Sequence, residues 1–282
     1  MKTYTLISEL KKALRDKRVG GKKVGFVPTM GALHEGHISL IRRSKEENSI
    51  TVCSIFVNPI QFTNRKDLDR YPRNLKEDSR ILKEAGCDIL FSPEVNEMYR
   101  GETNQFLDID LGALDKVLEG KFRPGHFKGV VTIVKKLLDI IEPDRCYLGQ
   151  KDYLQFLIIN YMVIYFRIPV DIIGCPIIRE PDGLAMSSRN LQLTIGEREL
   201  APLIYETLCK VRKKAGTIPV RELQNWAIKK INDNPAFNVE YFEIVDKTTL
   251  LPVEAWNNRQ NSIALTAAYL GDIRLIDNMD LF

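Results

Sequence analysis

Short apolar runs of strand length alternate with segments of helical periodicity from the N-terminus to about Cys175. The expected strands cover residues 22–28, 50–57, 88–91, 145–148 and 170–174. The segments that predict helices cover residues 4–17, 38–48, 74–85, 128–141 and 152–166, where apolar side chains recur every three or four positions. Strands that alternate with helices in this way predict βαβ units, and therefore an α/β fold built on a parallel sheet.

The pattern changes after Cys175. Two helical segments, 196–214 and 219–232, precede strand-like runs at 239–245, 262–269 and 273–277. Consecutive helices followed by consecutive strands are typical of a smaller α+β domain. We therefore predict two domains, residues 1–176 and 177–282, and we expect the loop 179–190 near their junction to close over the first domain.

The segment 92–125 is less regular than its surroundings. A helix-like stretch covers 111–118, and the glycine-rich run 119–126 is a loop by composition. The polar segment 61–72 is also expected to be a loop.

The first strand runs into the sequence PTMGALHEGH, residues 28–37, and a helix follows at Ile38. Glycine allows a backbone to approach a ligand closely, and a helix start offers N–H groups and a positive dipole end to a phosphate. His34 and His37 would lie on one side of that first turn. The alternatives are a plain βα turn with exposed histidines and, less favoured, a zinc site; the stretch is one residue shorter than H-E-x-x-H and has no nearby cysteine.

Polar groups also follow the other expected strands. Ligands of parallel sheets bind beyond the carboxyl ends of the strands, so these groups predict one site. They are Asn58 and Gln61 after the second strand, Lys151, Asp152 and Gln155 after the fourth, and Arg179 and Met186–Arg189 after the fifth.

Composition and the absence of common motifs narrow the function. The net charge of +4 is mild and does not indicate nucleic-acid or membrane binding, although it suits small anionic substrates. The five cysteines have no C-x-x-C spacing and the N-terminus has no apolar signal core, so we expect a cytoplasmic protein. The longest apolar run, 156–166, is too short for a membrane span and predicts a buried helix. The sequence has no G-x-S-x-G, no P-loop and no G-x-G-x-x-G after the first strand.

Five motifs in order resemble the pantothenate synthetase (pantoate–β-alanine ligase) family, and the resemblance covers nearly the whole chain. They are the turn 28–41, FVNPIQF at 56–62, YPR at 71–73, GQKD at 149–152 and MSSRN at 186–190. The family belongs to the nucleotidyltransferase superfamily, whose H-x-G-H turn resembles the HIGH signature of class I aminoacyl-tRNA synthetases. The resemblance implies a Rossmann-like parallel sheet with helices on both faces and a smaller C-terminal α+β domain.

The resemblance also implies the reaction. Pantoate, β-alanine and ATP would give pantothenate, AMP and diphosphate through an enzyme-bound pantoyl adenylate, with Mg²⁺ carried by ATP. The family is usually a homodimer. It implies no nucleic-acid partner and no membrane.

Site residues follow from the same match. His37 resembles the family's proton donor, His34 a phosphate contact and Lys151 the cation on the reacting phosphate. Gln61 and Gln155 resemble the two amides that bind pantoate. The residues expected to bind ATP are Met30, Gly31, Ala32, Leu33, His34, Glu35, Gly36, His37, Gly149, Gln150, Lys151, Asp152, Ile178, Met186, Ser187, Ser188 and Arg189.

Some residues depart from the family pattern or have no assigned role. Many members have glutamate at Gln150 and glutamine at Leu154, which bears on substrate detail. Arg123 and His126 lie in a loop that could reach the site, with no role assigned. No metal ligand is assigned either: Glu77 and Asp78 are read as ordinary solvated acids of a helix face.

Two other functions stay open from the residues. One is an adenylyl- or cytidylyltransferase that acts on a phosphorylated small molecule, because such enzymes share the H-x-G-H turn. The other is a nucleotide-binding regulatory module without turnover, against which the two histidines and Lys151 argue.

Overall fold

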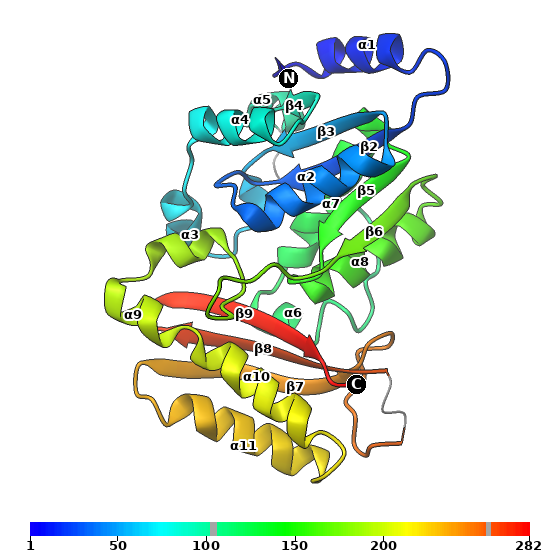
Figure 1. The fold of residues 1–282 in the computed structure, drawn as a ribbon. Coiled ribbons are helices and arrows are strands. Elements are labelled where there is room, and N and C mark those ends of the chain that lie inside the picture. Colours follow the sequence, from blue (N-terminus) through cyan, green and yellow to red (C-terminus); the bar gives the residue numbers. More distant parts are fainter. Residues whose placement is uncertain (102–105, 258–260) are drawn as a thin grey trace. The chain divides into compact units, whose positions relative to one another are not determined.

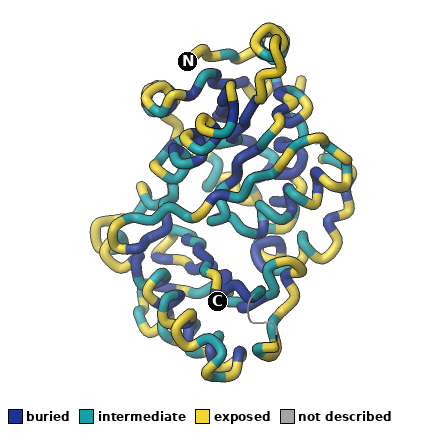
Figure 2. Tube along the Cα trace, turned by 45° about the vertical axis from the view of Figure 1, so that its right-hand side comes forward, coloured by how far each residue is buried: buried dark blue, intermediate teal, exposed yellow. Residues whose placement is uncertain are grey.

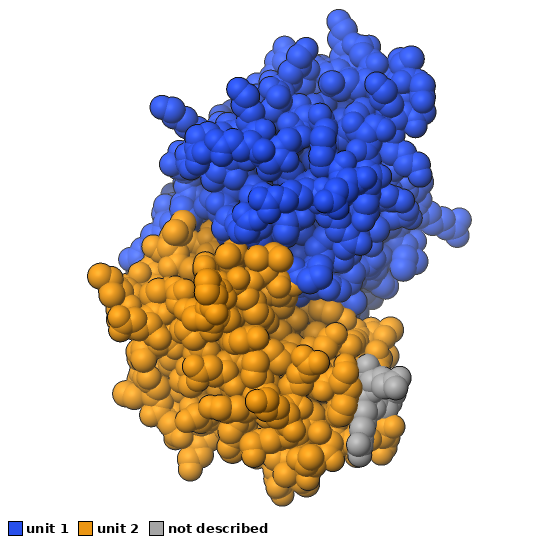
Figure 3. Space-filling view, viewed as in Figure 1, with its two compact units in different colours: residues 1–150, 154–176 blue, residues 151–153, 177–282 orange. Residues whose placement is uncertain are grey.

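The computed structural model describes residues 1–101, 106–257 and 261–282. The chain forms two compact units (Figure 3). Unit 1 contains residues 1–150 and 154–176, and unit 2 contains residues 151–153 and 177–282. Unit 2 therefore includes three residues, 151–153, that lie within the sequence range of unit 1.

Unit 1 is built on a six-stranded parallel sheet in the order β1-β4-β3-β2-β5-β6 (Figure 1). Its strands are β1 (Lys2–Tyr4), β2 (Val24–Thr29), β3 (Ile50–Ile55), β4 (Ile89–Phe91), β5 (Arg145–Gly149) and β6 (Asp171–Cys175). Every residue of β3 is buried, as are the first four of β2. Central parallel strands are covered on both faces, which explains why these runs are apolar without alternation (Figure 2).

Helices cover both faces of this sheet, with α2 on one face and α7 on the other (Figure 1). The helices of unit 1 are α1 (Ile7–Lys17), α2 (Glu35–Glu47), η1 (Pro59–Gln61), α3 (Arg65–Arg70), α4 (Leu75–Glu84), α5 (Val95–Tyr99), α6 (Glu119–Phe122), α7 (His126–Ile141) and α8 (Tyr153–Tyr165). The predicted α/β class, with a parallel sheet and helices on both faces, is confirmed.

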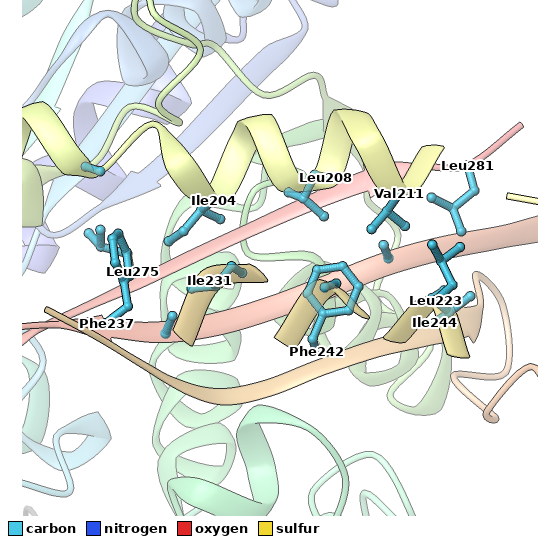
Figure 4. Packing of buried hydrophobic residues seen from close by; sticks show 14 of the residues in the cluster. Ile204, Leu208, Val211, Leu223, Ile231, Phe237, Phe242, Ile244, Leu275 and Leu281 are labelled. Atoms are coloured by element: carbon cyan, nitrogen blue, oxygen red, sulfur yellow. The ribbon is translucent and has the colours of Figure 1, made fainter. Parts of the chain in front are cut away.

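Unit 2 is a three-stranded antiparallel sheet, in the order β7-β8-β9, with two helices packed on it. Its elements are η2 (Ser188–Gln192), α9 (Ile195–Leu200), α10 (Leu203–Lys214), α11 (Val220–Asn232), β7 (Phe237–Asp246), β8 (Ser262–Leu270) and β9 (Ile273–Asp280). Figure 4 shows how Ile204 and Leu208 of α10, Ile231 of α11 and Phe242 of β7 converge on one apolar core. The predicted smaller α+β domain is confirmed.

Several local predictions were wrong. Residues 2–4 form β1, which pairs with β4, although helix was expected from residue 4. Three residues are too few to show a period, so only the pairing partner reveals the strand. Residues 111–118 form turns, and a short helix, α6, begins at Glu119 where a loop was expected. The polar segment 61–72 contains α3.

Two further helices differ from expectation. The segment 196–214 is divided into α9 and α10, because Pro202 lacks the N–H that would continue a helix. Helix α8 was expected to be buried, but Ile164 is 75% exposed and Tyr165 52% exposed. One stripe of α8 packs inward and the other faces solvent. Within the described residues, no helix is long and apolar enough to cross a membrane.

Candidate active site

The strand order of unit 1 places a crossover between β2 and β5. From β2 the chain proceeds outward through β3 to β4, and it then returns to the other side of β2 to form β5 and β6. Open parallel sheets bind ligands at the carboxyl ends of the strands, where the order reverses. Residues 30–34 follow β2, and Gln150 follows Gly149, the last residue of β5, so both segments flank this crossover. Gln150 is held there by its backbone N–H, which donates to the Cys175 carbonyl at 2.9 Å.

Residues 30–37, called the histidine turn below, are closed by two reciprocal hydrogen bonds. The Gly36 N–H donates to Nδ1 of His34 at 3.2 Å, and the His34 N–H donates to Nδ1 of His37 at 3.3 Å. His34 is thus the N-cap of α2, and His37 closes the capping box in the position usually taken by glutamate or glutamine. The two rings lie 4.1 Å apart between centroids.

These capping bonds determine the tautomer of both histidines. An imidazole nitrogen that accepts a hydrogen bond carries no proton, so each neutral ring has its proton on Nε2. Each neutral ring therefore carries its N–H donor at Nε2. The third ionisable residue of the turn, Glu35, is exposed and pairs with Arg42.

Asp78 of α4 holds the histidine turn through hydrogen bonds to its backbone. Its two carboxylate oxygens accept the N–H groups of Ala32, at 3.0 Å, and Leu33, at 2.8 Å. The turn needs a left-handed backbone at Gly31 (φ 82°), where a Cβ would lie 2.9 Å from Asp78 Oδ2. Asp78 is only 2% exposed, so its interpretation as a solvated surface acid was wrong. Burial raises the pKa of its carboxyl group, and the two N–H donors oppose that shift.

The two glutamines occupy different environments. Gln61 ends η1, is 8% exposed, and donates from Nε2 to the Met30 sulfur of the histidine turn at 3.0 Å. Gln155 is half-buried in the first turn of α8, and the neighbouring Leu154 is buried. The structure therefore brings Gln61 against the histidine turn.

Unit 2 carries the other predicted phosphate-binding residues on residues 178–189, called the serine loop below. The Met186 N–H donates to the Ile178 carbonyl at 3.0 Å, so these two residues face each other across a hairpin. The Ser187 hydroxyl accepts the Arg189 N–H at 3.3 Å and caps η2. Ser188 is buried.

The serine loop is tied to β9 by a buried ion pair. Arg179 donates to both carboxylate oxygens of Asp277, at 2.7 and 2.9 Å, and stacks over the ring of Tyr205. The Asp277 side chain is 4% exposed, and burial raises the pKa of its carboxyl group while Arg179 opposes that shift.

Lys151 belongs to the same unit as the serine loop, although it lies only two residues after the end of β5 in sequence. Its carbonyl accepts the side-chain amide of Asn278 at 3.0 Å, and the Asn278 carbonyl accepts a guanidinium N–H of Arg179 at 3.2 Å. Asn278 therefore links Lys151 to the serine loop through β9. Asp152 is half-buried beside Lys151.

Two residues that organise these segments were missed from the sequence. Asp78 lies four residues before the buried Leu82 on α4, and Asp277 lies two residues after the buried Leu275 on β9. Helical and strand periodicity therefore placed both acids on the buried face, and that signal could have found them. Among the described residues, no three His, Cys, Asp or Glu side chains form a group that could hold a metal ion.

Known proteins match this chain along its whole length. A family model described as pantoate-beta-alanine ligase matches residues 2–280. A relative named pantothenate synthetase, from Bacteroides thetaiotaomicron, is 48% identical over 280 residues, which are 99% of this chain and 98% of the relative.

Solved structures agree with the sequence comparison. A pantothenate synthetase from Thermus thermophilus is 40% identical, with a TM-score of 0.93 and full coverage of both chains. A pantoate-beta-alanine ligase from Francisella tularensis, complexed with beta-gamma ATP and beta-alanine, is 39% identical; its TM-score is 0.84, with 100% of this chain and 98% of that chain covered.

Proposed function

This chain belongs to the pantoate–β-alanine ligase family, and on that premise we propose that it condenses (R)-pantoate with β-alanine. ATP drives the reaction, and the products are pantothenate, AMP and diphosphate. The carboxylate of pantoate first attacks the α-phosphorus of ATP and displaces diphosphate. The amine of β-alanine then attacks the resulting pantoyl adenylate and displaces AMP.

The first step requires an anionic carboxylate to approach a polyanion. Donors and cations placed on the phosphate oxygens reduce this repulsion and stabilise the charge that develops in the transition state. The observation that carries the proposal is the reciprocal histidine cap at the crossover of the sheet. It presents two Nε2–H donors beside the start of a helix, where anions bind favourably.

The residues predicted to contact phosphate are assigned the following roles in the first step. We assign to His37 the donation of a proton or hydrogen bond to the reacting phosphate, to His34 a second phosphate contact, and to Lys151 the charge on the α-phosphate. The backbone of Met30–His37 and of Gly149–Asp152, with Ile178 and Met186–Arg189, would contact the rest of ATP. Support comes from the capping geometry in unit 1 and from the linkage of Lys151 to the serine loop in unit 2.

Gln61 and Gln155 are proposed to bind pantoate. An amide both donates and accepts, which suits a hydroxy acid that carries a carboxylate and hydroxyl groups. The ligand named for the Francisella tularensis structure, β-alanine, is the proposed second substrate. Mg²⁺ is proposed to arrive with ATP, bound to its phosphate oxygens.

We also propose that the enzyme is a cytoplasmic homodimer. The apolar side chains of Tyr161, Ile164 and Tyr165 gather on the outer stripe of α8 and are 37–75% exposed, as expected of a surface that a second copy covers. Light scattering would give the mass in solution. A dimer that Ile164→Lys does not weaken would place the interface elsewhere.

The product assay with each substrate omitted in turn tests the proposed reaction. Net AMP formation should require pantoate, β-alanine and ATP together, with one pantothenate for each AMP. ADP as the nucleotide product would reject the proposal. Nucleotide transfer to a phosphorylated small molecule without β-alanine would instead indicate a nucleotidyltransferase.

A further inference from the structure

A buried polar chain lies beside Gln61 in unit 1 and begins at Tyr99. The Tyr99 hydroxyl is 2.7 Å from Oδ1 of Asn58, and Nδ2 of Asn58 is 3.1 Å from Oε1 of Gln61. Tyr99, Asn58 and Gln61 are 4%, 1% and 8% exposed, respectively. Buried polar groups in such a chain are costly to leave unpaired, so each one restricts the orientation of the next.

The direction of this chain is fixed by a backbone carbonyl. The Asn58 amide is also 3.1 Å from the Gly129 carbonyl, which can only accept a hydrogen bond, so this end of Asn58 must be its NH₂ group. Its other end is then an oxygen, and the Tyr99 hydroxyl donates to it. The same NH₂ group donates to Gln61, so the Gln61 oxygen faces Asn58 and its own NH₂ group faces Met30.

A second chain holds the backbone of Gln61. Nδ1 of His126 is 2.7 Å from the Gln61 carbonyl, and Nε2 is 3.1 Å from a guanidinium nitrogen of Arg123. Arginine can only donate, so Nε2 accepts and the proton of His126 lies on Nδ1, which donates to Gln61. Arg123 is itself paired with the buried Glu119 at 2.6 Å.

Close packing of α7 against η1 also restricts the position of Gln61. A Cβ at Gly129 of α7 would lie 2.6 Å from the Gln61 Cα and 2.6 Å from the Ile60 carbonyl, so the helix backbone lies directly against η1. The Gln61 amide, its backbone and its helix are thus held from three directions.

We propose that Tyr99 and His126 are positioning residues for the hydroxy-acid substrate, acting through Gln61. The proposal rests on the assignment of Gln61 to pantoate. Tyr99 and Asn58 turn the Gln61 NH₂ group toward Met30 of the histidine turn as a donor, and His126 fixes the backbone from which it projects. The site therefore selects a substrate oxygen that accepts a hydrogen bond at this point.

Tyr99→Phe removes only the hydroxyl, which together with the Gly129 carbonyl orients Asn58. The KM for pantoate should rise about tenfold, because one neutral buried hydrogen bond corresponds to roughly that factor. The KM for ATP and the kcat should stay within about threefold of wild type. A split of this kind separates substrate positioning from a general loss of folded protein.

Tyr147→Phe is the matched control. Tyr147 is also buried in unit 1. Its hydroxyl accepts from Nδ2 of another asparagine, Asn48, at 2.6 Å and donates to the Glu47 carboxylate at 2.8 Å. Loss of this hydroxyl should lower the melting temperature by at least as much as Tyr99→Phe does, with the KM for pantoate unchanged.

His126 provides an independent arm of the test. In His126→Leu the Gln61 carbonyl loses its donor, and the KM for pantoate should again rise about tenfold or more. His126→Asn can place an amide N–H near the position of Nδ1 and should recover most of the loss.

Two results would overturn the proposal: a KM for pantoate that is unchanged in Tyr99→Phe, or one that rises equally in Tyr147→Phe. Failure of the proposed function is distinguishable, because wild-type protein would then form no pantoate-dependent AMP.

Discussion

The histidine turn and the serine loop are each held by a buried aspartate, but the two carboxylates bind different partners. Asp78 accepts two backbone N–H groups of the turn itself. Asp277 accepts two N–H groups of one side chain, Arg179, which in turn donates to the Gly183 carbonyl of the loop at 3.0 Å. The turn is therefore fixed directly through its backbone, whereas the loop is fixed through a side-chain ion pair.

This difference predicts different weaknesses. Loss of the Asp78 acceptor leaves two N–H groups of the turn unpaired, although no cation is stranded. Loss of Arg179 leaves the buried Asp277 carboxylate without its cation. The resulting loss of stability is larger than the stabilisation that the intact ion pair contributes. Four predictions test this comparison and the chemistry proposed for the two segments, from the largest expected effect to the smallest.

His37→Ala should lower kcat by roughly 10²–10⁴, because the variant lacks the donor assigned to the reacting phosphate. It also lacks the acceptor that caps α2, so His37→Gln serves as the control: glutamine at this position can close a capping box. Rapid-quench measurement of AMP should find both variants slow. If glutamine restored the rate, His37 would not act as a proton donor, because an amide N–H can donate a hydrogen bond but not a proton.

Arg179→Met should destabilise unit 2 by about 3–5 kcal/mol, the usual cost of breaking a buried pair from one side. Urea unfolding followed by the fluorescence of Trp226 and Trp256, which both lie in unit 2, would measure it. The double variant Arg179→Met with Asp277→Asn should recover part of the loss, since no buried charge then remains. Equal stability of the single variant and wild type would show that the loop does not depend on the pair.

Asp78→Ala should lower the free energy of unfolding by about 2–4 kcal/mol, because two N–H groups lose their acceptor. It should also raise the KM for ATP. Asp78→Asn retains one acceptor and should cost less. The pKa of Asp78 is raised above its ordinary value of 3.8. Its stabilising contribution is therefore complete below pH 3.8 and decreases as the pH rises through the raised value.

The pH dependence of stability follows from the raised pKa of Asp78. The stability difference between wild type and Asp78→Asn should be larger near pH 4 than at pH 7, measured as the free energy of unfolding. A difference that grows with pH would mean that the turn lowers the pKa of Asp78 instead.

Gln61→Ala should raise the KM for pantoate about tenfold and leave the KM for ATP nearly unchanged, because one substrate hydrogen bond is lost. Gln155→Ala, at the half-buried position on α8, should have a similar but smaller effect. An effect of Gln61→Ala confined to ATP would contradict its assignment to pantoate.

The sequence predicted five of the six strands of unit 1 and the α+β character of unit 2, because burial makes the strands of unit 1 continuously apolar and gives unit 2 its apolar pattern. It did not predict β1, whose three residues are defined only by their pairing with β4. The candidate site was predicted from polar residues at strand ends and from the family motifs. The supports of these residues were not. Periodicity places Asp78 on the buried face of α4, but the hydrogen-bond partners that give Asp78 and Tyr99 their roles lie far away in the sequence.

The central claim is that the histidine turn promotes attack of the pantoate carboxylate on the α-phosphorus of ATP. Exchange of labelled diphosphate into ATP tests this step most directly. Wild-type enzyme given pantoate without β-alanine should catalyse the exchange, and His37→Gln should reduce its rate by roughly 10² or more. Exchange that needs no pantoate, or that His37→Gln leaves at the wild-type rate, would contradict the account.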